Sequence, residues 1–480
     1  MNHPRSRPRV GATREGQGQA TGGLVLVRID GLAPGGDAVG RQQSAVVEAR
    51  DGATRPSTEP GPGDGRAIFV PLAAPGETVR ARLTRQKARV AWGELEAIVS
   101  PPAAVRVAPP CPLFGTCGGC QWQHVALEAQ RSSKRQIVAR ALEYPEVDLE
   151  LRAPTPEGAG YRERARVLVG AGGEIGFRAR RSHQVVDVPR CLLLAPPLAA
   201  ALAGLRSLGV AGWLPPGSEL DLQAGRAGVH LRVQLAADGD RHGHGGGTGG
   251  AGGNGSHMSA PVAAPDGSRW LEALRPYGVV GVVAVTVTVT ATRRGCAAGE
   301  AAVDVAEPGS PPLRIPAGGF SQVGRAANAA LVEAALGAVG PDPGSVLELY
   351  AGSGNFTRHL CARAGVVVAH DGDRDAVARG RLNAPAARWL DAGALASTML
   401  GAAPDTVFVD PPRGGLDAVA FAAAVRARAQ IVYVSCDPQT LGRDARRLQA
   451  AGFRLTHALA LDLMPHTHHV EVIAHFTRHV

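Results

Sequence analysis

The sequence is short of three things: long apolar segments, lysine and paired cysteines. No apolar stretch among its 480 residues reaches the length that spans a bilayer, and the basic N-terminus lacks the apolar core of a signal peptide. The seven cysteines are odd in number and unevenly spaced, which argues against a disulfide scaffold. These absences predict a cytoplasmic protein with no membrane partner.

The positive charge of the chain comes almost entirely from arginine. Lysine occurs only at Lys87 and Lys134, yet the formal net charge is +9. Arginine binds phosphate through two parallel hydrogen bonds, so the excess of positive charge predicts a polyanionic partner. The arginine content can equally follow from the base composition of the genome. Hydrophobic residues make up 45% and charged residues 19%, as in soluble globular proteins, and a chain of this length needs two or three domains.

The first 101 residues divide into a tail and a small barrel. Residues 1–21 have the composition of a disordered basic tail. Residues 22–101 predict an OB-like β-barrel interrupted by a long loop at 41–65, with strands at Leu24–Ile29, Ala67–Val70, Thr78–Leu83 and Val90–Val99. Basic residues from Val79 to Arg106 outnumber acidic ones by 6 − 2 = +4. This excess predicts a face for a nucleic-acid backbone, with a merely solvated surface as the alternative.

A cysteine cluster marks the second region, residues 102–311, for which we expect an α+β domain. Cys111, Cys117 and Cys120 have the close spacing of metal ligands, and Cys191 is the best candidate for the fourth ligand. The spacing favours an iron–sulfur cluster over zinc. It therefore predicts a four-cysteine site.

The remainder of this region mixes helix, strand and low-complexity sequence. A helix is expected at Val125–Glu143, and a strand at Tyr161–Val169 carries arginines on one face, which predicts a second surface for RNA. Residues 237–268 are rich in Gly and His and predict a flexible insertion. A strand at Val279–Thr290 and a linker near 308–312 complete the region.

Residues 312–480 alternate strands and helices, as in a Rossmann-like, doubly wound α/β domain. The strand Ser345–Leu349 runs into a turn with Gly352 and Gly354, which allows a backbone to approach a ligand but is not the GxGxxG pattern of dinucleotide sites. Acidic residues follow the next three expected strands, and their common edge predicts a cleft for ribose and adenine; these residues are Asp371, Asp391 and Asp410.

One cysteine has the setting of a reactive residue. The strand Gln430–Val434 leads to Cys436, and Asp437-Pro438 then supplies an N-cap for a helix at Thr440–Gln449. A helix N-terminus favours a thiolate, so Cys436 is a candidate nucleophile, whereas most lone cysteines are small core residues.

The layout as a whole resembles the S-adenosylmethionine-dependent RNA 5-methyluridine methyltransferases, over nearly the whole chain. The barrel is similar to their TRAM domain, and the last region to their class I methyltransferase domain. The matching motifs are Gly319-Phe-Ser-Gln322-Val, Leu349-Tyr-Ala-Gly-Ser-Gly-Asn355-Phe, Asp410-Pro-Pro-Arg413, Ser435-Cys436-Asp-Pro-Gln-Thr-Leu-Gly-Arg-Asp444 and Pro465-His-Thr-His-His-Val-Glu471. Gly324, Ala351 and Gly442 depart from the residues common in the family.

The resemblance implies roles for individual residues. Cys436 would be the nucleophile and Glu471 the base of a methyl transfer to uridine C5 in tRNA or ribosomal RNA. The cysteines would hold a [4Fe-4S] cluster, and the cofactor contacts would include Gln322, Tyr350, Asn355, Asp371 and Asp410. We expect a monomer. RNA cytosine-C5 methylation, or an RNA-binding or chaperone role with a vestigial methyltransferase domain, are the alternatives.

Overall fold

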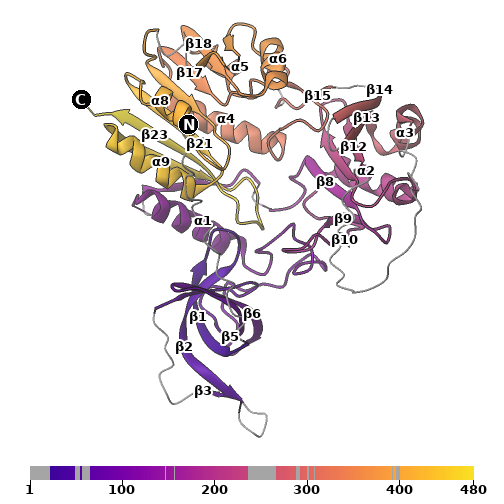
Figure 1. Ribbon diagram of the computed structural model, residues 1–480, viewed down its shortest axis with the longest axis vertical. Coiled ribbons are helices and arrows are strands. Elements are labelled where there is room, and N and C mark those ends of the chain that lie inside the picture. The colour runs from indigo at the N-terminus through magenta and orange to yellow at the C-terminus, as the bar shows by residue number, and fades with distance from the viewer. Residues whose placement is uncertain are drawn as a thin grey trace, which may run out of the picture. The chain divides into compact units, whose positions relative to one another are not determined.

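The computed structural model describes residues 22–48, 54–56, 65–145, 148–155, 157–235, 266–287, 292–299, 302–307, 309–391, 393–395 and 401–479. These residues form two compact units, Met1–Arg106 and Val107–Val480 (Figure 1). The predicted tail at 1–21 lies outside the described residues. Within the described ranges, no helix combines the length and apolar character needed to cross a bilayer.

The first unit is a closed five-stranded barrel. Its strands follow one another in the order β1-β5-β6-β4-β2, and β1 pairs with β2 to complete the ring. A short sixth strand, β3, extends β2. The strands are β1 Leu24–Leu32, β2 Ala38–Glu48, β3 Thr54–Pro56, β4 Ala67–Val70, β5 Thr78–Gln86 and β6 Val90–Ile98. The predicted barrel is therefore confirmed.

The loop predicted at 41–65 is wrong at its start. β2 continues to Glu48, because its backbone stays paired with β1 as far as the partners Ala45 and Val25. β3 then pairs with β2 through Val46 and Pro56. A Gly/Pro/Ser-rich composition did not reveal this backbone pairing.

The second unit contains a seven-stranded sheet in the order β10-β9-β8-β11-β12-β13-β14. Helices α2 (Pro196–Ser207) and α3 (Gly267–Leu274) cover one face of it, with leucines of both helices in its core. The strands are β8 Arg164–Val169, β9 Ile175–Arg178, β10 Val185–Asp187, β11 Glu219–Ala224, β12 Val229–Leu235, β13 Val279–Val287 and β14 Thr292–Gly299, with the 3-10 turns η2 Val210–Trp213 and η3 Arg275–Tyr277. The predicted insertion 237–268 mostly lies outside the described residues, but its last two residues belong to α3, which Asp266 caps.

An eight-stranded sheet forms the rest of this unit, in the order β19-β18-β17-β20-β21-β23-β22-β7. The five strands β19, β18, β17, β20 and β21 are parallel to one another, and β23 is antiparallel to both of its neighbours, β21 and β22. The strands are β7 Glu150–Arg152, β17 Ser345–Leu349, β18 Val366–His370, β19 Arg388–Leu390, β20 Thr406–Val409, β21 Gln430–Ser435, β22 Phe453–Leu461 and β23 Glu471–Arg478. A small hairpin, β15 Ala302–Asp304 with β16 Arg314–Pro316, precedes the sheet.

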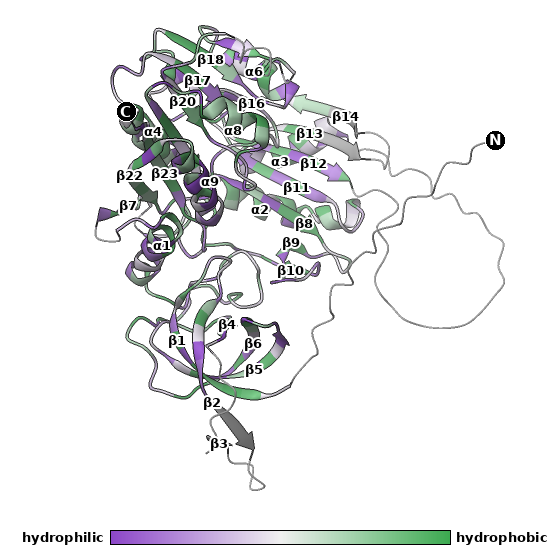
Figure 2. Cartoon of the chain, turned by 60° about the vertical axis from the view of Figure 1, so that its left-hand side comes forward, coloured by the Kyte–Doolittle hydropathy of each residue, from purple (hydrophilic) through white to green (hydrophobic). Residues whose placement is uncertain are grey.

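Helices cover both faces of this sheet, because alternate strand residues point to opposite layers. Val407, Ile431 and Tyr433 belong to one core, with leucines of α1 (Leu127–Leu142) and α9 (Pro438–Ala450). Phe408 and Val432 belong to the other, with α4 (Arg325–Val339). Figure 2 shows the hydrophobic colouring of β22 and β23 between these layers. The remaining helices are α5 Thr357–Leu360, α6 Arg374–Asn383 and α8 Ala418–Ala424. This is the predicted doubly wound α/β fold.

One strand of this sheet and one helix packed on it come from before residue 311. β7 pairs with β22 at the sheet edge, and α1 packs in the same hydrophobic core as α9. The described residues divide only at Arg106 and Val107. The predicted limits of the central domain, 102–311, and of the methyltransferase-like domain, 312–480, stay predictions.

Candidate functional site

The candidate site lies where the order of the eight-stranded sheet reverses. The chain moves outward from β17 to β18 and β19 on one side, and from β17 to β20 and β21 on the other. In doubly wound sheets, ligands bind outside the carboxyl ends of the strands at this switch point. A cleft of about 930 Å³ opens there, lined by the residues that follow β17, β18, β20 and β21 and by arginines from the β8 region.

The turn after β17 brings bare backbone to the cleft. Tyr350 and Gly352 have positive φ angles of 61° and 56°, and a Cβ atom on Gly352 would meet nothing within 4 Å. The Asp371 carboxylate accepts hydrogen bonds from the backbone N–H groups of Gly352 (2.8 Å) and Asp373 (2.8 Å). Asp371 therefore fixes this turn from the end of β18, as well as lining the cleft.

A buried polar network holds Asn355 at the end of this turn. Its side-chain amide exchanges two hydrogen bonds of 2.9 Å with the amide of Asn328 in α4. Asn328 in turn donates to Glu307, which also accepts from Arg358 at 2.5 Å. Asn328 and Glu307 carried no motif in the sequence, since their role depends on a contact between distant segments.

The structure brings most of the predicted cofactor residues together. Gln322, Tyr350, Gly352, Asn355, Asp371 and Asp410 line the cleft. Gly354 is not among the lining residues, and its Cβ position faces the ring of Trp389. Asp391 is likewise absent from the lining, and its carboxylate accepts from Arg381 at 2.9 Å on the exposed surface.

The two candidate catalytic residues stand opposite each other. β21 and β23 are antiparallel, and their last pair is Ser435 with Val472. Extending this register by one residue sets Cys436 opposite Glu471, and both residues line the cleft. Glu471 is 6% exposed and lies in an inner strand, so it is not a surface carboxylate on a sheet edge.

The expectation that Cys436 is an activated thiolate is not supported by its surroundings. Burial and the carboxylates of Glu471, Asp410 and Asp437 raise the pKa of the Cys436 thiol to about 11, and Arg413 opposes them. The helix N-terminus does not help, because the Asp437 carboxylate caps it by accepting from the backbone N–H groups of Gln439 (2.9 Å) and Thr440 (3.0 Å). The sequence identified Asp437 as this cap, but the dipole argument did not count its negative charge against the thiolate.

Two carboxyl groups share this part of the cleft, the buried Glu471 and the half-buried Asp410. Burial raises the pKa of Asp410 to about 7. Burial, and secondarily Asp410, raise the pKa of Glu471 to about 8, while Arg413 lowers it. Both groups therefore titrate near neutral pH, as catalytic acids and bases do.

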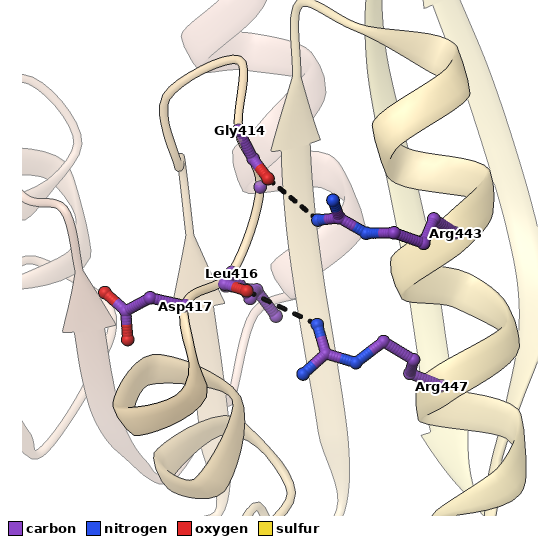
Figure 3. Close-up of a pocket in the computed structure, with 6 residues that line it drawn as sticks. Gly414, Leu416, Asp417, Arg443 and Arg447 are labelled. Atoms are coloured by element: carbon purple, nitrogen blue, oxygen red, sulfur yellow. Dashed lines mark hydrogen bonds between the residues drawn. The ribbon is translucent and has the colours of Figure 1, made fainter. Parts of the chain in front are cut away.

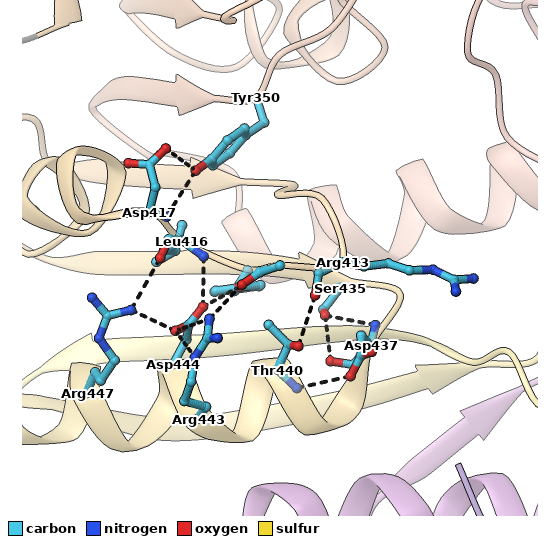
Figure 4. A network of polar contacts seen from close by, with 12 residues as sticks. Tyr350, Arg413, Leu416, Asp417, Ser435, Asp437, Thr440, Arg443, Asp444 and Arg447 are labelled. Carbon is cyan, nitrogen blue, oxygen red and sulfur yellow. Dashed lines mark hydrogen bonds and ion pairs between the residues drawn. The ribbon is translucent and has the colours of Figure 1, made fainter. Parts of the chain in front are cut away.

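Arg413 lowers the pKa of both Cys436 and Glu471, and its motif gave the only sequence signal for it. Its guanidinium Nη2 lies 3.2 Å from Nδ1 of His469, two residues before Glu471. Beyond Arg413 the chain turns toward Asp417, which accepts from the hydroxyl of Tyr350 at 3.2 Å (Figure 4). The turn after β20 thus carries Arg413, which acts on Cys436, and Asp417, which contacts Tyr350 in the glycine turn.

The segment before Glu471 is held by distant residues. The Lys134 ammonium, fully buried in α1, donates to Asp462 (2.5 Å) and to the Met464 carbonyl (3.1 Å). Gln130 accepts from the backbone N–H of His466 at 2.8 Å, and the backbone N–H of Trp122 donates to the His466 carbonyl at 3.0 Å. Helix α1 and the end of the cysteine-rich segment therefore brace the approach to β23.

The four predicted metal ligands lie near one another. Burial, above all, raises the pKa of the Cys117, Cys120 and Cys191 thiols, and each is raised further by neighbouring cysteines, including Cys111. A backbone bridge joins Cys117 to Ala179, in the loop after β9. Among the described residues, no three metal-ligating side chains are already arranged around one point.

The arginines predicted on one face of a strand reach the cleft. Arg162, Arg164 and Arg166 line it, whereas Ala165 and Val167, on the opposite face of the strand, are buried. Arg166 is paired with Asp221 at 2.9 Å, and the Arg164 guanidinium lies 5.9 Å from the ring of Phe320. Phe320 is 74% exposed, so it offers an aromatic face beside these cations.

Comparison with known proteins gives consistent matches. A family model described as tRNA (Uracil-5-)-methyltransferase matches residues 398–479. The 23S rRNA (uracil(1939)-C(5))-methyltransferase RlmD of Chromohalobacter salexigens is 33% identical over 442 residues, 86% of this chain and 85% of that protein. The protein of the same name from Alkalilimnicola ehrlichii is 34% identical over 436 residues, 86% of this chain and 92% of its own length.

A solved structure matches nearly the whole chain. The crystal structure of Pyrococcus abyssi tRNA (uracil-54, C5)-methyltransferase in complex with S-adenosyl-L-homocysteine has a TM-score of 0.66, covering 93% of this chain and 99% of that one. Its sequence identity is 22%, so this likeness concerns the fold.

Proposed function

Because this chain belongs to the family of RNA (uracil-C5)-methyltransferases, we propose that it transfers the methyl group of S-adenosylmethionine to C5 of one uridine in 23S rRNA, through a covalent adduct on Cys436. The observation that carries this proposal is the antiparallel register that sets Cys436 opposite Glu471 in the cleft.

The chemistry explains why a thiol and a carboxylate are needed together. Uracil C5 is a poor nucleophile, so the thiolate of Cys436 adds to C6 and its electron pair moves through the ring to give an enolate. S-adenosylmethionine supplies the electrophilic methyl group, which C5 takes as the methyl–sulfur bond breaks. The Glu471 carboxylate then removes the C5 proton, and the C6–sulfur bond breaks to restore the ring and the thiolate.

The cleft fits such a cofactor. The open backbone at Gly352 leaves room for a ligand against the turn. Asp371 and Asp410 follow adjacent strands of the switch point, where they can accept hydrogen bonds from hydroxyl and amino groups. We assign the cofactor contacts to Gln322, Tyr350, Gly352, Asn355, Asp371 and Asp410.

Activation of Cys436 depends on its neighbours. With a pKa of about 11, the thiol holds its proton at neutral pH, so the proton must leave to solvent before the sulfur adds to C6. Arg413 is the one cation among the charges that shift this pKa, and it favours the thiolate. We infer that Arg413 stabilises the attacking sulfur.

We assign a [4Fe-4S] cluster to the cysteine site because Cys111, Cys117 and Cys120 have the spacing of a cluster motif rather than that of paired zinc knuckles. Four thiols gather from two segments, and their burial disfavours free thiolates, whereas a bound metal centre would stabilise them. Cys111, Cys117, Cys120 and Cys191 would ligate the cluster. Since Trp122, next to this segment, contacts His466, the cluster would stabilise the approach to Glu471 without entering the chemistry.

RNA contacts are assigned to two surfaces. Arg162 and Arg164 would position phosphates at the cleft, and Phe320 would stack on a base. On the barrel, the Arg85 guanidinium lies 5.1 Å from the ring of Trp92, which stacks on Phe69, as in platforms for single-stranded nucleic acid. The target uridine must leave its stack for its C6 to reach Cys436.

The experiment is methylation in vitro with nucleoside mass spectrometry. The purified protein, S-adenosylmethionine and unmodified 23S rRNA should give 5-methyluridine at the counterpart of uracil 1939, and unmodified tRNA should give none. Modification of tRNA alone would contradict the rRNA assignment. 5-Methylcytidine as the product would contradict the reaction.

A further inference from the structure

One face of helix α9 binds the turn that carries Arg413. The hydroxyl of Thr440 donates to the Arg413 carbonyl (2.9 Å), and Arg443 donates to the Gly414 carbonyl (2.8 Å). Arg447 donates to the Leu416 carbonyl at 3.3 Å (Figure 3). Positions 440, 443, 444 and 447 share one helix face, so the contacts form a continuous stripe.

Asp444 is the centre of this stripe and is completely buried. One carboxylate oxygen accepts from the backbone N–H of Leu416 (2.9 Å) and from the hydroxyl of Tyr433 (3.0 Å). The other accepts from Arg443 (3.0 Å) and Arg447 (2.9 Å), as Figure 4 shows. A single carboxylate therefore holds the turn, the strand β21 and both arginines of the stripe.

The turn fits closely against this carboxylate. Gly415 has φ +78°, and a Cβ atom there would lie 2.4 Å from the Asp444 oxygen. A side chain at this position would push the turn away from α9. The position of Arg413 relative to α9 is thus set by backbone contacts on both sides of Gly415.

Helix α9 begins at Pro438, and its N-cap Asp437 directly follows Cys436. The same helix therefore anchors Cys436 at its N-terminus and, through Thr440 and Asp444, the turn that carries Arg413. Arg413 and Cys436 line the same cleft. The charged groups that shift the pKa of the Cys436 thiol are Glu471 from β23, Asp410 and Arg413 from the end of β20, and Asp437 from the N-cap of α9. Only Arg413 among these favours the thiolate.

We propose that Asp444 is a positioning residue for the methyl transfer: it holds the Arg413 turn against α9 and so keeps Arg413 in the cleft that it shares with Cys436. This inference rests on the proposed function, because it assigns a purpose to a reactive Cys436. It adds a residue that touches neither the RNA nor the cofactor.

The test is the alkylation rate of Cys436 in the full-length protein, read by mass spectrometry of the Cys436 peptide between about pH 7 and pH 10. Below the thiol pKa this rate follows the thiolate fraction. We expect Asp444→Asn to lower the rate at each pH on the order of tenfold, equivalent to one pKa unit. Thr440→Val, which removes a single bond to the turn, should lower it by a smaller factor. Arg446→Gln, on the same helix but outside the stripe, is the matched control and should match wild type.

The direction of the change separates positioning from a direct charge effect. Loss of the Asp444 negative charge by itself would favour the thiolate and speed alkylation. An alkylation rate that rises or stays unchanged in folded Asp444→Asn overturns the proposal. If thermal unfolding shows that Asp444→Asn does not fold, the alkylation rate of Thr440→Val is judged by the same criterion. The assay uses neither RNA nor cofactor, so its outcome stays distinct from a failure of rRNA methylation by the wild-type protein.

Discussion

Cys436 and Glu471 lie one residue beyond the last register pair of two antiparallel strands, Ser435 of β21 with Val472 of β23, so the extended register sets them opposite each other. They are brought together because β23 inserts between β21 and β22 instead of joining the sheet edge. Cys436 and Glu471, which are 471 − 436 = 35 residues apart in sequence, thereby line one cleft. The predictions below follow from this pairing.

Replacement of the base should trap the reaction halfway. In Glu471→Gln the amide cannot take the C5 proton, so the Cys436–RNA adduct should accumulate as a band of reduced mobility in denaturing gels, while the turnover number falls by about 10²–10⁴-fold. Glu333→Gln, an exposed glutamate of α4, is the control. Wild-type turnover by Glu471→Gln would assign the base to another group.

The rate should rise with pH across the neutral range. The reaction needs ionised Glu471, with a pKa of about 8, and ionised Cys436, with a pKa of about 11. Both ionised fractions grow as pH increases, so kcat/KM should climb by at least about tenfold per pH unit below pH 8. Single-turnover methylation of an rRNA fragment from pH 6 upward measures this. A kcat/KM that falls over that range would be incompatible with these two ionisations.

The buried ion pair below the Glu471 segment should contribute strongly to stability. Lys134→Met leaves the Asp462 carboxylate buried without its closest cation, and loss of one partner from such a pair costs about 3–5 kcal/mol. We expect the urea midpoint of the second unit to fall markedly. The double variant Lys134→Met with Asp462→Leu should recover much of the loss, since it buries no unpaired charge. Equal instability of the single and double variants would contradict this account of the pair.

The cysteine site should make the protein brown when it is purified without oxygen. Four thiolates should hold about four iron and four sulfide per chain, with a broad visible absorption that Cys117→Ser removes. Cys361→Ser, outside the cluster, should retain the colour. A colourless protein with one zinc per chain would overturn the [4Fe-4S] assignment.

The sequence was sufficient for features built from local patterns. Apolar strands, the glycine turn and the N-cap at Asp437 follow from residues next to one another, and all are present. The pairing of three-residue β7 with β22 carries no local pattern, and neither does the Asn328–Asn355 amide pair, because both depend on contacts across the fold. The thiolate at Cys436 was expected from a helix dipole, but burial opposes it, and so do the neighbouring Asp437 and two carboxylates from other segments, Glu471 and Asp410.

The direct test of the covalent mechanism is a mass spectrum of the protein after reaction with S-adenosylmethionine and an rRNA fragment that contains 5-fluorouridine at the target position. Fluorine replaces the proton that Glu471 would remove, so the adduct cannot collapse. The account predicts a peptide containing Cys436 that carries the nucleotide and one added methyl group. An adduct on another cysteine, or complete methyl transfer with no adduct, would contradict it.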